Sequence, residues 1–126
     1  IRKEEAAEIF LSSRSKRQFY DKDINQLLTT HIYNNKVLKD SDWKKIEAGL
    51  LKAYPAFKEK LLGLYALSDT EYRICMLIKM EVSPSNIADL MAISKSAVSQ
   101  NRLRMQQKVF DGEGTAKDWD KFVLSL

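Results

Sequence analysis

The sequence predicts an all-α fold, in which an N-terminal helical linker or hairpin precedes a helix-turn-helix bundle. Two observations carry this prediction. Apolar residues recur at helical spacing along most of the chain, and Ser or Thr residues that can cap a helix stand before several of these apolar runs. No stretch alternates apolar and polar residues as a half-buried strand does. We therefore expect linker helices in residues 1–40 and the helix-turn-helix bundle in residues 41–126.

The first 40 residues are expected to form two helices, at about 2–16 and 23–35. Apolar side chains in this segment have no evident packing partner, so we expect the segment to mediate self-association. These side chains are Ile9, Phe10, Phe19 and Ile24. A basic cluster of Arg14, Lys16 and Arg17 is more simply explained as a solvated helix face.

Three helices are predicted between residues 41 and 80. Ser41 or Asp42 opens the first, whose apolar side chains are Trp43, Ile46, Leu50 and Leu51. Pro55 starts the second, with Phe57, Leu61, Leu62 and Tyr65. Ser68 and Glu71 have the spacing of a capping box, in which each side chain accepts a hydrogen bond from the backbone amide of the other. The third helix follows, with Ile74, Leu77 and Ile78 on one side.

The last three predicted helices also have start signals. Ser83 precedes Pro84, and proline is tolerated in the first turn because no hydrogen bond requires its missing amide proton. Ser94 caps the next helix. Thr115 with Asp118 opens a short terminal helix that carries Trp119, Phe122 and Val123.

Residues 83–108 have the spacing of a helix-turn-helix motif. Ala88 is small where two helices cross closely, Ala92 lies at the turn, and Val98 is the apolar residue that the second helix directs into the core. The second helix of this motif enters the major groove of DNA. Because a left-handed turn costs alanine more than glycine, we expect this turn to differ slightly from the usual one.

The second helix of the motif has two distinct faces. At about 100° per residue, a stripe expected to pack on the core contains Val98, Asn101, Met105 and Val109. The opposite face is expected to read base edges, through Ser96, Ser99, Gln100 and Leu103. Serine and glutamine can bond bases, glutamine in bidentate fashion to adenine. Leu103 has three open interpretations: contact with a thymine methyl group, packing against a neighbouring chain, or an ordinary exposed apolar residue.

Positive charge is concentrated on this same helix. The whole chain has a net charge of +4, which alone is a weak indication of a nucleic-acid partner. Residues 95–108, however, contain four cations and no acidic residue. Local positive charge is what phosphate neutralisation requires. We expect phosphate contacts from Lys95, Arg102 and Arg104, and from Ser83 and Ser85 beside the first amides of the preceding helix.

Little in the sequence favours an enzyme, and we expect no catalytic residue, cofactor or metal. The chain of 126 residues has one histidine, one cysteine, no glycine-rich phosphate loop and no metal-ligand spacing. His31 is expected on a helix surface, and Cys75 as a buried apolar residue. No apolar run approaches the roughly 20 residues that span a bilayer, and no signal-peptide pattern is present. We expect a cytoplasmic location without membrane contact.

Five motifs follow one another from residue 43 to the end. They are a helix with Trp43, the pair Tyr54-Pro55, a Leu-Ser-x-x-Glu opening at 67–71, an Ile-Ala helix at 87–88, and Ser-x-Ser-Ala-Val at 94–98. In this order they resemble the C-terminal output domain of bacterial regulators whose N-terminal half consists of tetratricopeptide repeats. The core is also similar to LuxR-type and sigma-factor region four modules. The chain departs from the family at Ala92, and at Gln106 and Gln107, where the family usually has basic residues.

The resemblance implies the output end of a bacterial transcription regulator. An upstream sensor domain of the same parent chain would be joined to it, often through a transmembrane helix and a coiled coil. Two functions remain open from the residues themselves. The first is sequence-specific binding of double-stranded DNA without catalysis, and the alternative is a helical protein-interaction or dimerisation module that binds no DNA. The two are compatible, because DNA readers of this kind commonly dimerise.

Overall fold

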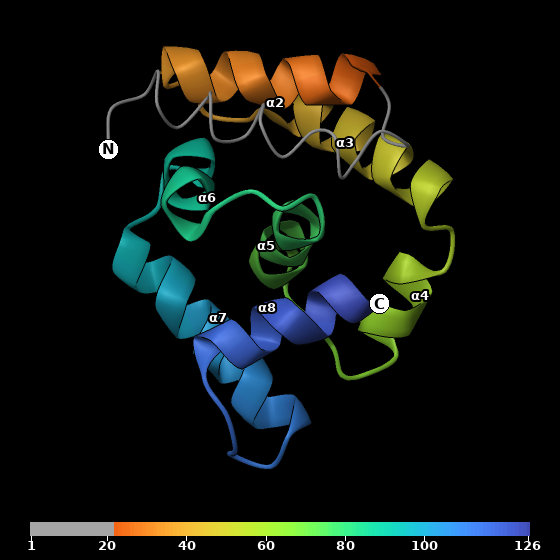
Figure 1. The fold of residues 1–126 in the computed structure, drawn as a ribbon, viewed down its shortest axis with the longest axis vertical. Coiled ribbons are helices and arrows are strands. Elements are labelled where there is room, and N and C mark those ends of the chain that lie inside the picture. Colours follow the sequence, from red (N-terminus) through yellow and green to blue (C-terminus); the bar gives the residue numbers. More distant parts are fainter. Residues whose placement is uncertain (1–21) are drawn as a thin grey trace.

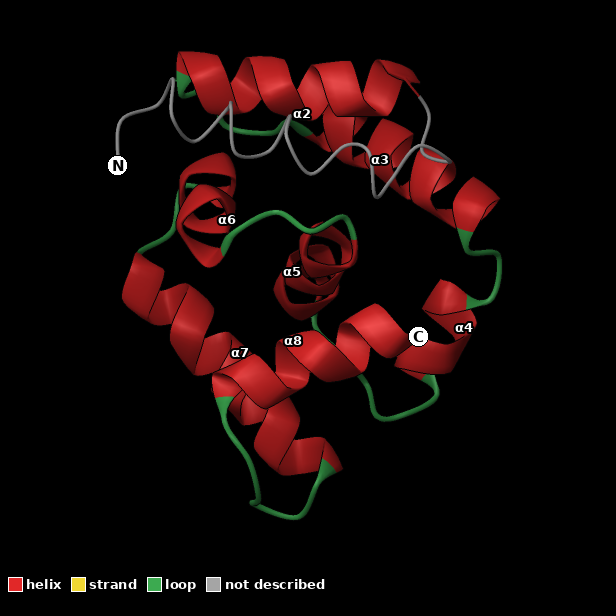
Figure 2. Cartoon of the chain, viewed as in Figure 1, coloured by secondary structure: helices red, strands yellow, loops and turns green. Residues whose placement is uncertain are grey.

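The computed structural model describes residues 22–126, and this part of the chain is all-helical, with seven helices and no strand (Figure 2). The helices are α2 (Lys22–Asn34), α3 (Asp40–Ala53), α4 (Phe57–Leu62), α5 (Asp69–Lys79), α6 (Pro84–Met91), α7 (Lys95–Val109) and α8 (Ala116–Ser125). The all-α prediction is confirmed. The predicted helix at 2–16, the basic cluster Arg14, Lys16 and Arg17, and the side chains of Ile9, Phe10 and Phe19 lie outside the described residues.

Helix α5 is the centre of the fold, with α2 and α3 on one side of it and α7 and α8 on the other (Figure 1). All seven residues from Ile74 to Met80 are buried. A helix that is buried all round needs neighbours on every side. The predicted capping box opens α5, since the Ser68 hydroxyl accepts from the Glu71 amide at 3.1 Å and the Glu71 carboxylate accepts from the Ser68 amide at 2.9 Å.

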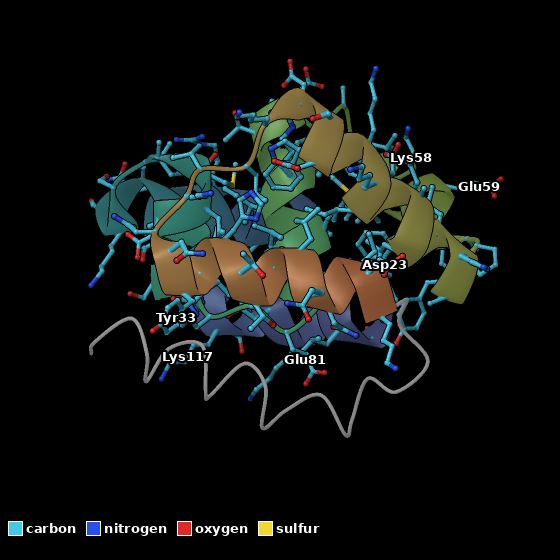
Figure 3. The ribbon with its side chains drawn as sticks, turned by 90° about the horizontal axis from the view of Figure 1, so that it is seen from above. Asp23, Tyr33, Lys58, Glu59, Glu81 and Lys117 are labelled. Carbon is cyan, nitrogen blue, oxygen red and sulfur yellow. The ribbon has the colours of Figure 1, made fainter. Side chains whose placement is uncertain are left out.

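Helix α2 shares this core, so the boundary predicted near residue 40 does not coincide with a break in packing. Its buried apolar side chains, Ile24, Leu28 and Ile32, belong to the same cluster as those of the bundle. Ile24 lies against Gly49 of α3, where an added Cβ would come within 2.6 Å of the Ile24 Cγ1 atom. Ile24 is therefore not available for the self-association predicted for it. Figure 3 shows α2 across the front of the molecule, with Asp23 and Tyr33 near its two ends.

Several predicted helix boundaries shift in the structure. Helix α3 begins at Asp40, one or two residues before the predicted start at Ser41 or Asp42, because the Asp42 carboxylate accepts from the Lys39 amide at 2.8 Å. Helix α4 begins at Phe57, two residues after Pro55. Helix α4 ends at Leu62, so Tyr65 lies beyond it. The Tyr65 hydroxyl instead donates to the Glu71 carboxylate at 2.9 Å.

The one histidine and the one cysteine of the chain, His31 and Cys75, both pack within the fold. The sequence predicts His31 on a helix surface, and the structure places it only partly there, because its side chain is 18% exposed and reaches from α2 to Asp42 of α3. Its Nδ1 atom is 2.8 Å from the Leu27 carbonyl oxygen, and its Nε2 atom is 3.4 Å from an Asp42 carboxylate oxygen. Cys75 is fully buried as predicted, and this burial raises the pKa of its thiol to about 12.

Within residues 22–126, none of the helices combines the length and the apolar character that crossing a lipid bilayer requires. The same part of the chain contains no group of three His, Cys, Asp or Glu side chains placed to hold a metal ion.

Candidate nucleic-acid interface

The turn between α6 and α7 has the left-handed geometry that glycine usually supplies. Ala92 has φ 54° and ψ 42°. The Ile93 amide donates to the Ala88 carbonyl at 3.0 Å and the Ala92 amide to the Asp89 carbonyl at 3.3 Å, which is the hydrogen-bond pattern of a Schellman motif. The expectation that alanine would change this turn is therefore wrong. The chain adopts the usual turn and bears a cost of about 1 kcal/mol for it.

Two predicted apolar contacts hold α7 on the fold. Val98 and Met105 are both fully buried, as predicted, and Ala88 of α6 is 2% exposed. The Met105 sulfur lies 3.6 Å from the Cys75 sulfur of α5. Helix α7 therefore packs against both α5 and α6, as the second helix of the motif must.

Arg102 is a correction to the predicted phosphate contacts. It is 6% exposed, and its guanidinium group makes a bidentate ion pair with Asp120 of α8. The Arg102 Nε atom donates to the Asp120 Oδ1 atom at 2.9 Å, and the Nη2 atom donates to Oδ2. A guanidinium group whose charge is neutralised by a carboxylate and that is almost removed from water is poorly placed to bind a phosphate. Arg102 fixes α8 against α7 instead.

Gln106 has a similar structural role. It is 6% exposed, and its side-chain amide donates to the Glu113 carbonyl at 3.2 Å, across the loop that joins α7 to α8. The predicted buried stripe is therefore rotated, since Arg102 and Gln106 are buried beside Val98 and Met105 while Asn101 and Val109 are only partly buried. Glutamine at position 106 has a physical reason, because its buried amide fixes the loop between α7 and α8.

The four predicted base-reading residues all remain on the surface of α7. Ser96, Ser99 and Gln100 are exposed, and Leu103 is 37% exposed. Ser94 caps the helix, and its hydroxyl accepts from the Ala97 amide at 3.0 Å. The first two turns of α7 consequently present exposed serine and glutamine side chains to the outside.

The predicted phosphate contacts have different surroundings. Lys95 and Arg104 are exposed on α7, and Arg104 makes a long contact of 3.5 Å with the Asn101 side chain. The Ser83 hydroxyl is exposed but accepts from the Asn86 amide at 3.2 Å, so it serves as the α6 cap, and Ser85 is half-buried. Lys108 is exposed, with its Nζ atom 5.1 Å from the centre of the Tyr65 ring. Exposed positive charge on α7 thus comes from Lys95, Arg104 and Lys108.

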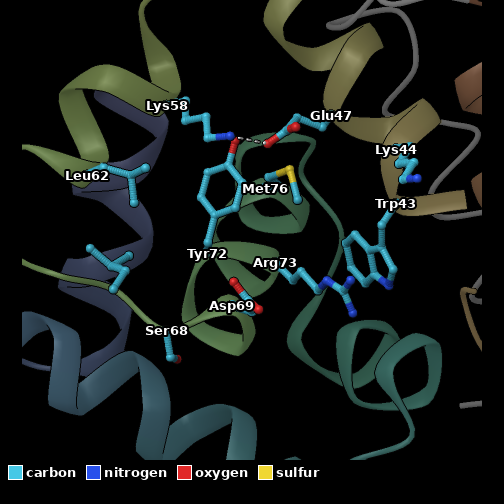
Figure 4. Close-up of a pocket in the computed structure, with 11 residues that line it drawn as sticks. Trp43, Lys44, Glu47, Lys58, Leu62, Ser68, Asp69, Tyr72, Arg73 and Met76 are labelled. Carbon is cyan, nitrogen blue, oxygen red and sulfur yellow. Dashed lines mark ion pairs between the residues drawn. The ribbon is translucent and has the colours of Figure 1, made fainter. Parts of the chain in front are cut away.

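A concavity between α3, α4 and α5 was not anticipated from the sequence, because its residues come from three separate helices. It has a volume of about 420 Å³ (Figure 4). Lys58 lies 3.2 Å from the Glu47 carboxylate, and the Arg73 guanidinium stacks 5.0 Å from the centre of the Trp43 ring while pairing with Asp40 at 3.3 Å. Lys58 and Arg73 therefore already have acidic or aromatic neighbours.

No protein-family model, no curated protein and no solved structure matches this chain. The geometry of α6, α7 and the loop to α8 is therefore the basis on which a function can be proposed.

Proposed function

We propose that this chain binds double-stranded DNA in a sequence-specific manner and without catalysis, with α7 in the major groove. The observation that supports the proposal is the exposure of Ser96, Ser99 and Gln100 on a helix whose other side is fixed by α5, α6 and α8. Serine and glutamine side chains match the donors and acceptors of base edges. They would read the sequence, while α6 lies across the groove.

Phosphate contacts in this proposal come from Lys95 and Arg104 on the exposed side of α7, and Arg102 takes no part. Lys108 lies further along the helix, beside Tyr65. Each phosphate neutralised contributes about −0.9 to the slope of log affinity against log salt for duplex DNA. With two such contacts, one copy of the chain is expected to show a slope of about −2.

The test is binding of a duplex selected from a random pool, followed by fluorescence anisotropy, with random duplex as the comparison. Gln100→Ala is expected to cost about 1 to 3 kcal/mol on the selected duplex and little on random DNA. Gln26→Ala is the matched control, because Gln26 is an exposed glutamine on α2. Equal losses on both duplexes would remove Gln100 from the base-reading residues.

The phosphate contacts have their own test. Arg104→Ala is expected to weaken binding to all sequences and to reduce the salt slope by about one unit. Lys22→Ala is the charge-matched control, since Lys22 is exposed at the start of α2, a helix on the opposite side of α5 from α7 (Figure 1). An unchanged slope for Arg104→Ala would mean that Arg104 contacts no phosphate.

The alternative function is a protein-interaction or dimerisation module, favoured by the exposed apolar side chain of Leu103. Absence of any salt-sensitive complex with duplex DNA at two salt concentrations would support this alternative. The further proposal that the chain is the output end of a bacterial, cytoplasmic transcription regulator with an upstream sensor rests on the sequence resemblance alone.

A further inference from the structure

A shallow depression lies directly beside the proposed base-reading residues. It has a volume of about 360 Å³ and a mainly apolar lining. One wall is the exposed face of α7, and the other is the start of α8 with the residues before it. The lining residues are Ser99, Gln100, Leu103, Gly114, Thr115 and Ala116.

The second wall of this depression is held in place by three contacts. Gln106 binds the Glu113 carbonyl at 3.2 Å. Gly114 has φ +96°, a conformation that residues with a side chain rarely adopt, and a Cβ atom there would come within 2.3 Å of the Gln106 Nε2 atom and displace the end of that side chain. Thr115 is fixed next, because its amide and its hydroxyl both donate to the Asp118 carboxylate, at 2.8 and 3.0 Å. The depression is therefore a built feature of the α7–α8 corner.

We propose that this depression receives the 5-methyl group of a thymine in the major groove, with Leu103 as the residue that contacts the methyl. This inference rests on the proposed function. The thymine methyl is the one apolar group that the major groove presents at a base edge. Leu103 follows Gln100 by three residues, so the two side chains lie on the same face, and both line the depression. Gln100 hydrogen-bonds a base while Leu103 and the Gly114–Ala116 wall exclude water from the neighbouring methyl.

The experiment uses the duplex selected from a random pool and replaces each of its thymines, one at a time, by deoxyuridine. This exchange removes the methyl group and leaves every hydrogen-bonding atom of the base in place. Burial of one methyl predicts about four-fold weaker binding of the native chain at one or more positions. Leu103→Ala is expected to bind thymine and uracil duplexes equally. Leu124→Ala is the control, because Leu124 is 44% exposed near the end of α8 and does not line the depression.

Two results would overturn the inference. The first is a selected duplex in which no thymine-to-uracil exchange weakens binding by the native chain. The second is a Leu103→Ala variant that keeps the discrimination. If this variant also changes the sedimentation of the free chain, the occupant of the depression is a second copy. In both of these results the DNA complex itself persists, whereas failure of the proposed function would appear as no salt-sensitive complex with any duplex.

Discussion

Removing the carboxylate of Asp120 is expected to destabilise the fold more than removing its partner. The Arg102 side chain is 7% exposed and the Asp120 side chain 26% exposed. Asp120→Ala would leave a buried guanidinium group without a counter-ion. Such a change costs about 3 to 5 kcal/mol at a fully buried ion pair. Because Asp120 is partly exposed, we expect a loss of about 3 kcal/mol. Arg102→Met leaves a carboxylate that water can reach, so we expect a smaller loss of about 1 to 2 kcal/mol.

The assay is urea unfolding followed by far-ultraviolet circular dichroism. With an m-value of about 2 kcal/mol per molar, a loss of about 3 kcal/mol lowers the midpoint by about 1.5 M. The double variant Arg102→Met/Asp120→Leu is expected within about 1 kcal/mol of the native chain, because two apolar side chains replace an ion pair that is largely removed from water. Asp89→Ala, at an exposed position of α6, is the control and should stay within about 0.5 kcal/mol. The reasoning fails if Asp120→Ala leaves the midpoint unchanged or costs less than Arg102→Met.

Three further predictions concern the turn, the loop and the buried thiol. Ala92→Gly is expected to raise the free energy of unfolding by about 0.5 to 1 kcal/mol, since glycine relieves the cost of φ 54°, and an unchanged or lower urea midpoint would contradict this. Gly114→Ala is expected to cost about 1 to 3 kcal/mol in thermal unfolding, because φ +96° is strained for a residue with a Cβ and the new Cβ would displace the Gln106 amide from Glu113; a native-like melting temperature would show that the loop adjusts without this cost. Burial raises the pKa of Cys75 from 9.0 to about 12, so the unfolded thiol ionises first and stability is expected to fall as pH rises from about 9 towards 12. Cys75→Ala should reduce this alkaline loss between about pH 9 and 10, and an unaltered profile there would exclude Cys75 as its source.

Helix starts were predictable from the sequence because capping is a local interaction. Ser68, Ser83, Ser94 and Thr115 each cap the helix that follows, and each side-chain oxygen accepts from the amide three residues later. All four caps lie within one turn of their partners along the chain. The Ala88, Ala92 and Val98 spacing was equally readable, because two short helices and a tight turn fix it.

The burial of Arg102 and Gln106 could not be read from the sequence in the same way. The angular pattern of α7 identified Val98 and Met105 correctly but assigned the positive charge of Arg102 to the surface. Its partner, Asp120, is 18 residues away and lies on another helix, so the charge becomes neutralised only once α8 is folded against α7. Gln106 likewise depends on a carbonyl in the loop at Glu113. Long-range polar pairs of this kind leave no periodic signal.

The polar residues of α7 fall into a buried group and an exposed group. Arg102 and Gln106 are polar but buried, where Arg102 pairs with Asp120 and Gln106 donates to the Glu113 carbonyl. Ser96, Ser99 and Gln100 are also polar, yet no other helix covers them. Helix packing therefore does not account for the choice of serine and glutamine at these positions. Since the same helix also exposes Lys95 and Arg104, its exposed face combines groups that suit bases with charges that suit phosphates, which is the combination that the proposed binding of duplex DNA would use.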